Sequence, residues 1–220
     1  AVLGRLAASV AHEIRNPLVA IQSLVEIIGE EVQGDLKEHA RVVLGEVHRL
    51  NRVVTELLSM VRPEMANLRS CDLKDIINEL MLLIRHEASR SGVKIKVSFP
   101  EVLGKIHIDA EKIKQAILNI VLNAIQSLKD GGEIDISLAD TPEFLTITIS
   151  NNGPEIPDEL RERIFEPFFT TKTSGTGLGL AITRKIVELH GGRMELESGT
   201  DLTLFRIILP HGEAHGKANS

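Results

Sequence analysis

Apolar residues near the N-terminus recur at the alternating intervals of three and four that are typical of packed helices. The clearest seam is unbroken up to Pro63 and consists of Leu36, Ala40, Val43, Val47, Leu50, Val54, Leu57 and Val61. A first helix is predicted over residues 1 to about 31 and ends in the polar, glycine-containing stretch 29–35. A short connection predicts an antiparallel hairpin. Because one hairpin offers too little interior for both seams, a dimer that closes into a four-helix bundle is expected.

The first helix carries one interruption in this pattern. Its seam positions between Val10 and Leu24 hold Glu13 and Pro17, and a proline in a helix interior costs roughly 3 kcal/mol. A bend or a loosened turn is therefore expected beside His12, with Asn16 one turn further on. Taken alone, this stretch favours a solvated histidine on a kinked helix over a reactive imidazole.

The pattern changes after a linker over residues 63–70. Helices are predicted from Asp72 to Gly92, from Asp109 to the glycines at 131–132, and from about Gly177 to Leu189. Alternating or apolar runs predict strands over 93–99, 105–108, 133–139, 144–150, 193–197 and 202–209. Mixed helices and mostly antiparallel strands predict an α/β sandwich, so the whole chain is α+β. The domains expected are residues 1–67 and 68–212, followed by a disordered tail over 213–220.

Composition narrows the classes of function. A net charge of −6 argues against a binder of nucleic-acid phosphates, and the absence of Trp and Tyr argues against a stacking surface for single strands. The single cysteine, Cys71, excludes an internal disulfide framework, and no apolar run reaches the roughly 18 residues of a membrane span. We expect a cytoplasmic protein with no membrane contact in this stretch. Because Ala1 replaces an initiator methionine and the seam already runs at Leu3, a fragment is expected.

Candidate chemistry appears first on the helix that follows Asp109. Asn119 and Asn123 are four residues apart and therefore project from one face of that helix. Each is either a satisfied core amide or a ligand, since asparagine oxygens also suit Mg²⁺. Asn151, Asn152 and Gly153 follow at a strand end, where a loop could wall a ligand.

A glycine-rich segment is the second candidate. Gly175, Gly177 and Gly179 open a helix, so free backbone N–H groups and the positive end of the helix dipole favour a phosphate there. The segment Phe165–Lys172, which holds half of the phenylalanines and a lysine, lies just upstream and leaves room for a mobile lid.

The order of these motifs resembles the H, N, G1, F and G2 boxes of sensor histidine kinases. The five boxes are His12-Glu-Ile-Arg-Asn-Pro-Leu18, Asn119-x-x-x-Asn123-Ala, Asn152-Gly-Pro154, Phe165-Glu-Pro-Phe-Phe169 and Gly175-Thr-Gly-Leu-Gly-Leu180. The resemblance implies a homodimeric phosphotransfer domain followed by an ATP-binding domain of the Bergerat type, shared with gyrase and MutL. The wording of the first and fourth boxes is closest to the nitrogen-regulation subgroup.

The resemblance also implies a role for each matching residue. His12 attacks the γ-phosphate of ATP, Glu13 accepts the proton on the other ring nitrogen, and the phosphoryl group passes to an aspartate of a response regulator. Asn123 is the implied Mg²⁺ ligand, and Asn16 matches the position that orients water when the same site acts as a phosphatase. The nucleotide site implied by the boxes consists of Asn119, Asn123, Asn151, Gly153, Lys172, Gly175, Thr176, Gly177, Leu178 and Gly179.

Two residues depart from the family pattern. Asn151 stands where an aspartate usually accepts a hydrogen bond from the adenine amino group, which removes about 1 kcal/mol of charge assistance. Glu155 replaces a glycine, and a non-glycine residue costs on the order of 1–2 kcal/mol if that position requires a positive φ. A nucleotide-impaired scaffold or phosphatase therefore stays open beside the kinase. The helical hairpin with His12 speaks against a protein-serine kinase. The stimulus, the response regulator, the balance of kinase and phosphatase, and the choice between cis and trans phosphorylation stay open.

Overall fold

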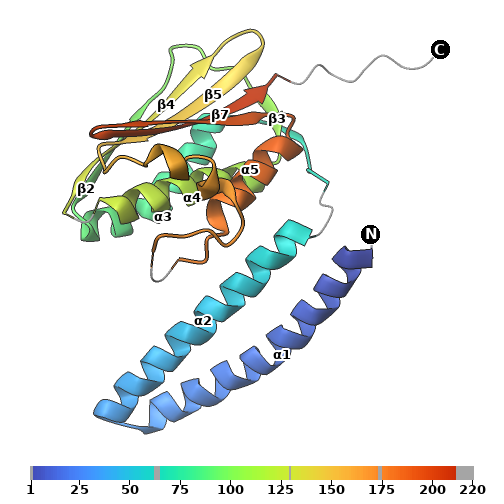
Figure 1. Cartoon of the computed structure of the whole chain (residues 1–220), viewed down its shortest axis with the longest axis vertical. Helices are drawn as coiled ribbons and strands as arrows, with labels where there is room; N and C mark the ends of the chain where they lie inside the picture. Colours follow the sequence, from blue (N-terminus) through green and yellow to red (C-terminus); the bar gives the residue numbers. More distant parts are fainter. Residues whose placement is uncertain (1, 62–64, 129, 173–174, 212–220) are drawn as a thin grey trace. The chain divides into compact units, whose positions relative to one another are not determined.

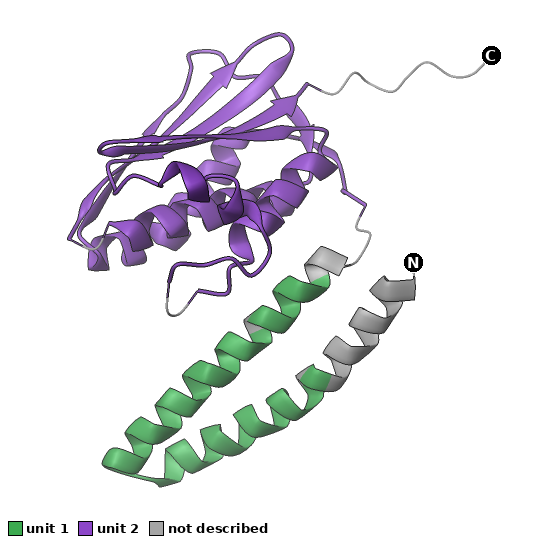
Figure 2. Cartoon of the chain, viewed as in Figure 1, with its two compact units in different colours: residues 1–64 green, residues 65–220 purple. Residues whose placement is uncertain are grey.

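The chain forms two compact units, residues 1–64 and residues 65–220 (Figure 2). The computed structural model describes residues 2–61, 65–128, 130–172 and 175–211, and only the backbone of residues 2–13, 15, 52 and 59–61. The expected domain boundary after residue 67 falls three residues beyond the boundary between the units. The expected tail over 213–220 lies outside the described residues.

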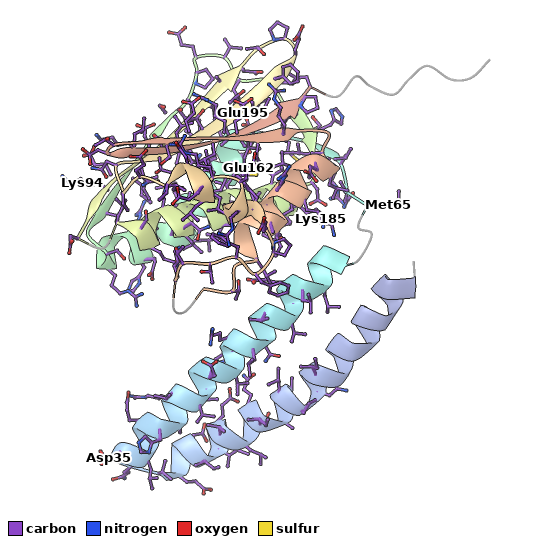
Figure 3. The ribbon with its side chains drawn as sticks, in the orientation of Figure 1. Asp35, Met65, Lys94, Glu162, Lys185 and Glu195 are labelled. Atoms are coloured by element: carbon purple, nitrogen blue, oxygen red, sulfur yellow. The ribbon has the colours of Figure 1, made fainter. Side chains whose placement is uncertain are left out.

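Unit 1 is a hairpin of α1 (Val2–Glu31) and α2 (Asp35–Val61). The two predicted helices are confirmed, and α1 continues through Pro17 as one helix. Figure 3 draws their described side chains, with Asp35 labelled at the beginning of α2. None of the helices in the described part of the chain combines the length and hydrophobicity that crossing a membrane requires.

The heptad seam of α2 divides into two rows. The residues of each row are seven apart. The described side chains of one row are buried within the hairpin, and they are Ala40, Val47 and Val54. Leu18 of α1 is also buried. The other row is exposed and consists of Leu36, Val43, Leu50 and Leu57. On α1, large apolar side chains are likewise exposed at Ile14, Ile21, Leu24 and Ile28. Among the described side chains of the α2 seam, the single hairpin therefore buries one row and leaves the other exposed.

Unit 2 packs three helices against one face of a five-stranded sheet (Figure 1). The helices are α3 (Leu73–Arg90), α4 (Ala110–Ser127) and α5 (Gly179–Leu189), and two short 3₁₀ turns are η1 (Asp158–Leu160) and η2 (Arg163–Phe165). The sheet has the order β2 (Val93–Ser98), β4 (Gly132–Asp140), β5 (Phe144–Asn151), β7 (Leu202–Pro210) and β6 (Arg193–Gly199). Only the β2–β4 pair in this sheet is parallel. The α+β architecture predicted from the sequence is confirmed.

Strand β5 shows how the sequence pattern produces this packing. Its burial alternates along the strand, and the buried positions are Leu145, Ile147, Ile149 and Asn151. Successive side chains of a strand point to opposite faces, so these four lie on the same face, toward the helical layer. Asn151 is the polar member of this buried row, and it stands at the strand end.

The predicted linker over 63–70 is wrong at its C-terminal end. Residues Arg69–Cys71 form β1, which pairs antiparallel with β3 (Ile106–Ile108) in a separate two-stranded sheet. The partner strand lies about 35 residues further along the chain, with Cys71 opposite Ile106. A three-residue strand is too short to show alternation, so the local sequence carried no signal for it.

Asp109 fixes the beginning of α4, the helix that carries Asn119 and Asn123. Its carboxylate accepts hydrogen bonds from the N–H groups of Lys112 (3.3 Å) and Asn67 (3.0 Å), and its own N–H donates to Nε2 of His190 (3.0 Å). Burial raises the pKa of Asp109, but the hydrogen bonds from Asn67 and Lys112 outweigh it, so the pKa lies below its ordinary value. One residue thus joins α4, the end of α5 and the chain that enters unit 2.

Asp109→Ala is expected to lower the free energy of unfolding by about 1–2 kcal/mol, because it removes an N-cap. The pKa of Asp109 is lower in the folded than in the unfolded protein, so its ionised carboxylate stabilises the fold. This stabilisation is complete above pH 3.8, the ordinary pKa, and is lost as the pH falls through the lower pKa of the folded state. Urea unfolding followed by circular dichroism at several pH values measures both effects. Glu111→Ala is the control: Glu111 is an exposed residue whose partner Lys114 keeps a second ion pair with Glu79, so its loss should cost less than about 0.5 kcal/mol. Equal effects of the two substitutions would contradict the assigned cap.

Candidate functional site

Polar side chains spaced four residues apart form a row along helix α4. Asn119 lies in the middle of the helix, Asn123 one turn further on, and Ser127 at its last residue. Residues four apart lie on one face of a helix, so these three side chains follow one line. Ser127 was missed in the sequence, although the repeated interval of four pointed to it.

Asn119 ties α4 to the first turn of α5. Its Nδ2 donates to the carbonyl oxygen of Gly179 (3.1 Å) and lies 3.3 Å from Oγ1 of Thr183. The Thr183 hydroxyl, which is buried, also donates to the Gly179 carbonyl (2.9 Å). Asn119 is half-buried, and its Nδ2 is already bonded within the protein, so its effect on the site is to hold the beginning of α5 in place.

Asn123 faces a lysine from the segment before the glycines. Nζ of Lys172 donates to Oδ1 of Asn123 (3.0 Å) and to Oε1 of Gln126 (2.7 Å). Burial lowers the pKa of Lys172, because removal from water disfavours the charged ammonium. A cationic group thus occupies the amide oxygen that the sequence suggested as a Mg²⁺ ligand. The part of the chain that the structure describes has no group of three or more His, Cys, Asp or Glu that could hold a metal ion. Asn123 could therefore contribute a single amide oxygen to Mg²⁺, which keeps most of its waters and binds largely through phosphates.

Helix α5 begins at Gly179, two residues later than predicted from the sequence. Gly177 has a φ of +69°, which a right-handed helix does not allow, and this ends the loop before the helix can begin. Leu178 provides no side-chain cap, and its own N–H donates to Oγ1 of Thr176 (3.3 Å). The N–H groups of the first turn of a helix have no partner within it, so the beginning of α5 favours an anion.

The phenylalanine-rich segment is attached to this glycine loop. The N–H of Phe168 donates to the carbonyl oxygen of Gly177 (3.0 Å), and Phe168 itself has a φ of +67°. A Cβ atom on Gly177 would lie 2.5 Å from the carbonyl carbon of Phe168 and 2.7 Å from the carbonyl oxygen of Phe169. The two segments therefore meet only because residue 177 has no side chain. The predicted lid includes residues 173–174, which lie outside the described residues.

The loop after β5 closes the other end of the polar row. A Cβ atom on Gly153 would lie 2.6 Å from Nδ2 of Asn151 and 3.0 Å from Oγ of Ser127, so both side chains converge on this glycine. Asn152 is held by the next strand, since its N–H donates to the Glu133 carbonyl (3.2 Å) and its Oδ1 accepts from the Glu133 N–H (2.8 Å). The two adjacent asparagines therefore differ in their contacts. Asn152 is bonded to β4, whereas the Asn151 amide lies beside Gly153 at the end of the polar row, which we call the Gly153 edge.

Glu155 does not introduce the backbone strain that its position suggested. Among the described residues, positive φ values at non-glycine positions occur at Phe168 and Asp201 only. The Glu155 carboxylate instead lies 3.4 Å from Nη2 of Arg161, whose guanidinium also donates to the carbonyl oxygens of Ser198 (2.6 Å) and Ile156 (3.3 Å). Arg161 holds this loop against β6 and was not singled out in the sequence.

Unit 1 contains the stretch His12–Leu18, which lies within α1. His12 and Glu13 lie in α1, one turn before Pro17, but their side chains fall outside the described part of the chain. Asn16 is exposed, and the neighbouring Leu18 is buried. The remaining predicted residues gather within unit 2, between the beginning of α5, Lys172 and the Gly153 loop.

Comparison with known proteins identifies two families along the chain. Residues 2–66 match the His Kinase A (phospho-acceptor) domain, and residues 108–213 match the histidine kinase-, DNA gyrase B- and HSP90-like ATPases. The chain is 39% identical over 198 residues to the sensor histidine kinase ZraS of Escherichia coli O157:H7, which covers 89% of this chain and 43% of ZraS. It therefore spans less than half the length of that curated relative.

Two solved structures are also similar. The nucleotide-free catalytic domain of the histidine kinase ThkA is 34% identical, with a TM-score of 0.62, over 66% of this chain and 96% of that domain. ThkA in complex with the response regulator protein TrrA is 30% identical, with a TM-score of 0.71, over 96% of this chain and 62% of that one.

Gly177→Ala should disturb the contact between the two segments of the site. Because residue 177 is both left-handed and crowded by the backbone of Phe168, we expect a loss of roughly 2 kcal/mol or more in the free energy of unfolding. Gly199→Ala is the matched control, since Gly199 has no positive φ and its Cβ would meet nothing within 4 Å. Thermal and urea unfolding of both variants makes the comparison, and a Gly177→Ala protein as stable as Gly199→Ala would contradict the described geometry.

Proposed function

The chain belongs to the sensor histidine kinases, and we propose that it transfers the γ-phosphoryl group of ATP to His12 and then to an aspartate of a response regulator. One observation supports this most strongly. Lys172 lies on Asn123, and the uncapped first turn of α5 is bonded to Asn119, so both lie along the same polar row of α4. Together these groups offer positive charge and N–H donors to a polyphosphate.

Each part of unit 2 has a distinct task in this proposal. The beginning of α5, with Gly175, Thr176, Gly177, Leu178 and Gly179, supplies N–H donors around the phosphates. Lys172 adds a positive charge beside them, and Asn151 with Gly153 borders the adenine. Asn123 would hold a Mg²⁺ ion, which supplies charge neutralisation on the phosphates when bound.

His12 carries the transfer. A neutral ring nitrogen of His12 attacks the γ-phosphorus, the bond from that phosphorus to the bridging oxygen breaks, and ADP leaves with its electron pair. Glu13 accepts the proton of the other ring nitrogen, so the phosphorylated imidazole is left neutral. The aspartate of a response regulator then attacks the same phosphorus, the phosphorus–nitrogen bond breaks, and the imidazole is restored. ThkA was solved with such a regulator, TrrA.

Asn16 supports a second activity at the same surface. It is exposed one turn beyond His12, where an amide can orient water toward a phosphorylated regulator. We therefore propose that the chain also dephosphorylates its regulator. Assignment to the nitrogen-regulation subgroup stays a prediction from the motif wording. Because the reaction consumes ATP, we place it in the cytoplasm.

A scaffold that no longer makes phosphohistidine is the alternative function, and Asn151 favours it. The missing carboxylate weakens the interaction with adenine by about 1 kcal/mol. Glu155, the other feature that supported this alternative, adds no positive-φ strain.

Incubation with γ-labelled ATP and Mg²⁺ separates the two functions. Acid-labile, alkali-stable label is expected on the wild-type chain and no label on His12→Ala. Asn123→Ala should carry at least about tenfold less label, because Mg²⁺ loses a protein ligand there. His39→Ala and His48→Ala are matched controls, since both histidines are exposed on α2 and should leave the label unchanged. A wild-type chain without label would support the scaffold.

A homodimer follows from the exposed half of the heptad seam. The Val43 and Leu50 side chains are 43% and 44% exposed in the single hairpin, and covering them by a second copy would remove apolar area from water. Val43→Glu with Leu50→Glu should convert a dimer to a monomer in sedimentation equilibrium. Val42→Glu is the control, because Val42 is 64% exposed and lies off the seam. A wild-type monomer at micromolar concentration would contradict the proposal.

A further inference from the structure

Asn151 has a side-chain amide that makes no hydrogen bond within the described part of the chain. Its side chain stands on the core face of β5, at the strand end, and the residue is only 6% exposed. Among the described residues, the fully buried side-chain atoms without a partner are Nε of Arg49 and Oδ1 of Asn51, so the Asn151 amide still reaches the surface. A polar group that reaches the surface and has no partner in the protein is available to a group that is supplied from outside.

The polar neighbours of Asn151 do have partners. Asn152 is bonded to Glu133, and the Ser127 hydroxyl donates to the Ala124 carbonyl (2.8 Å). Thr203 lies opposite Asn151 in the β5–β7 register, and its hydroxyl bonds to Ser198 (2.9 Å) and to the Pro154 carbonyl (3.3 Å). These bonds leave the Asn151 amide as the unpaired group at the Gly153 edge.

An unpaired amide is also free to choose its orientation. The oxygen and the NH₂ of asparagine exchange places when the terminal torsion turns by about 180°, and only hydrogen bonds decide between the two states. Because no described protein group holds the Asn151 amide, the ligand decides. A carboxylate at this position has no such choice, since an ionised carboxylate only accepts hydrogen bonds.

This difference matters at position 6 of a purine. Adenine presents an amino donor there, whereas guanine and hypoxanthine present an oxygen acceptor. Oδ1 of Asn151 can accept from the amino group, and Nδ2 can donate to the oxygen after the amide turns. A carboxylate would leave two acceptors facing each other, and sites with an unpaired buried polar group reject a ligand strongly.

We infer that Asn151 relaxes base selection, so that the chain binds 6-oxopurine nucleoside triphosphates as well as ATP and uses them as phosphoryl donors to His12. This inference rests on the proposed function. The transfer keeps the same balance of bonds as with ATP, with the corresponding 6-oxopurine nucleoside diphosphate as the leaving group. Asn151 acts on the base alone and does not touch the reacting phosphorus.

Inosine triphosphate is the matched probe, because its base differs from adenine at position 6 and in the proton on N1, and carries no 2-amino group. Calorimetric titration of the wild-type chain with Mg-ATP and Mg-ITP should give dissociation constants within about tenfold of each other. Label from γ-labelled ITP should appear on His12. Binding of ATP with ITP more than about tenfold weaker would overturn this inference and leave the kinase standing, whereas failure of both nucleotides to bind would overturn the kinase as well.

Asn151→Asp reverses the chemistry and provides the second test. ATP should bind roughly five- to tenfold more tightly because the acceptor becomes charged, and ITP at least about tenfold more weakly, so the ratio changes by about 50-fold or more. Asn152→Asp is the control: it makes the same change one residue away, where Oδ1 already accepts from Glu133, and should leave the ratio unchanged. A ratio unaffected by Asn151→Asp, or equally affected by Asn152→Asp, would overturn the assignment of base selection to Asn151. The wild-type comparison needs no variant and stands even if Asn151→Asp fails to fold.

Discussion

The hydrogen bond from the Asn119 amide to the Gly179 carbonyl joins the middle of α4 to the first turn of α5. It spans 60 residues of sequence and is reinforced by the buried Thr183 hydroxyl on the same carbonyl. The direction in which the N–H groups of α5 point depends on this junction, and so does the place where the glycine loop must end. With α5 held, Gly177 meets the backbone of Phe168, and the segment that carries Lys172 returns to Asn123 one turn along α4. The site is thus arranged by an amide between two helices rather than by its exposed loops.

Much of the fold could be predicted because the deciding signals are local. Asp72 and Asp109 begin their helices as N-caps, and the heptad intervals located α2 to within a residue or two. The parts that could not be predicted depend on distant partners. Strand β1 exists because β3 lies beside it, and α5 starts late because the conformation of Gly177 is set by contact with Phe168. Local patterns carry no information about either contact.

The candidate site shows the same division between residue type and environment. The motif order placed Asn119, Asn123, Asn151 and Lys172 in one region, but it did not distinguish an amide that holds the core from one that faces a ligand. Asn119 and Asn152 proved to be satisfied by the backbone, whereas Asn151 did not. Spacing reveals which face a side chain occupies, and only the surrounding hydrogen bonds reveal whether the side chain is already in use. Arg161 was missed because the groups that fix it on β6 and in the loop are the carbonyl oxygens of Ser198 and Ile156, which no sequence motif records.

Lys172 changes what binding at this site means electrostatically. Its Nζ already donates hydrogen bonds to the amide oxygens of Asn123 and Gln126 from within the chain, and it loses part of its hydration there. In the nucleotide-binding function proposed above, a divalent ion held by the oxygen of Asn123 would compete with Lys172 for that oxygen, and a displaced lysine would be available to the phosphates. Binding would then replace a positive charge that is tethered to the protein by one that is carried in with the nucleotide.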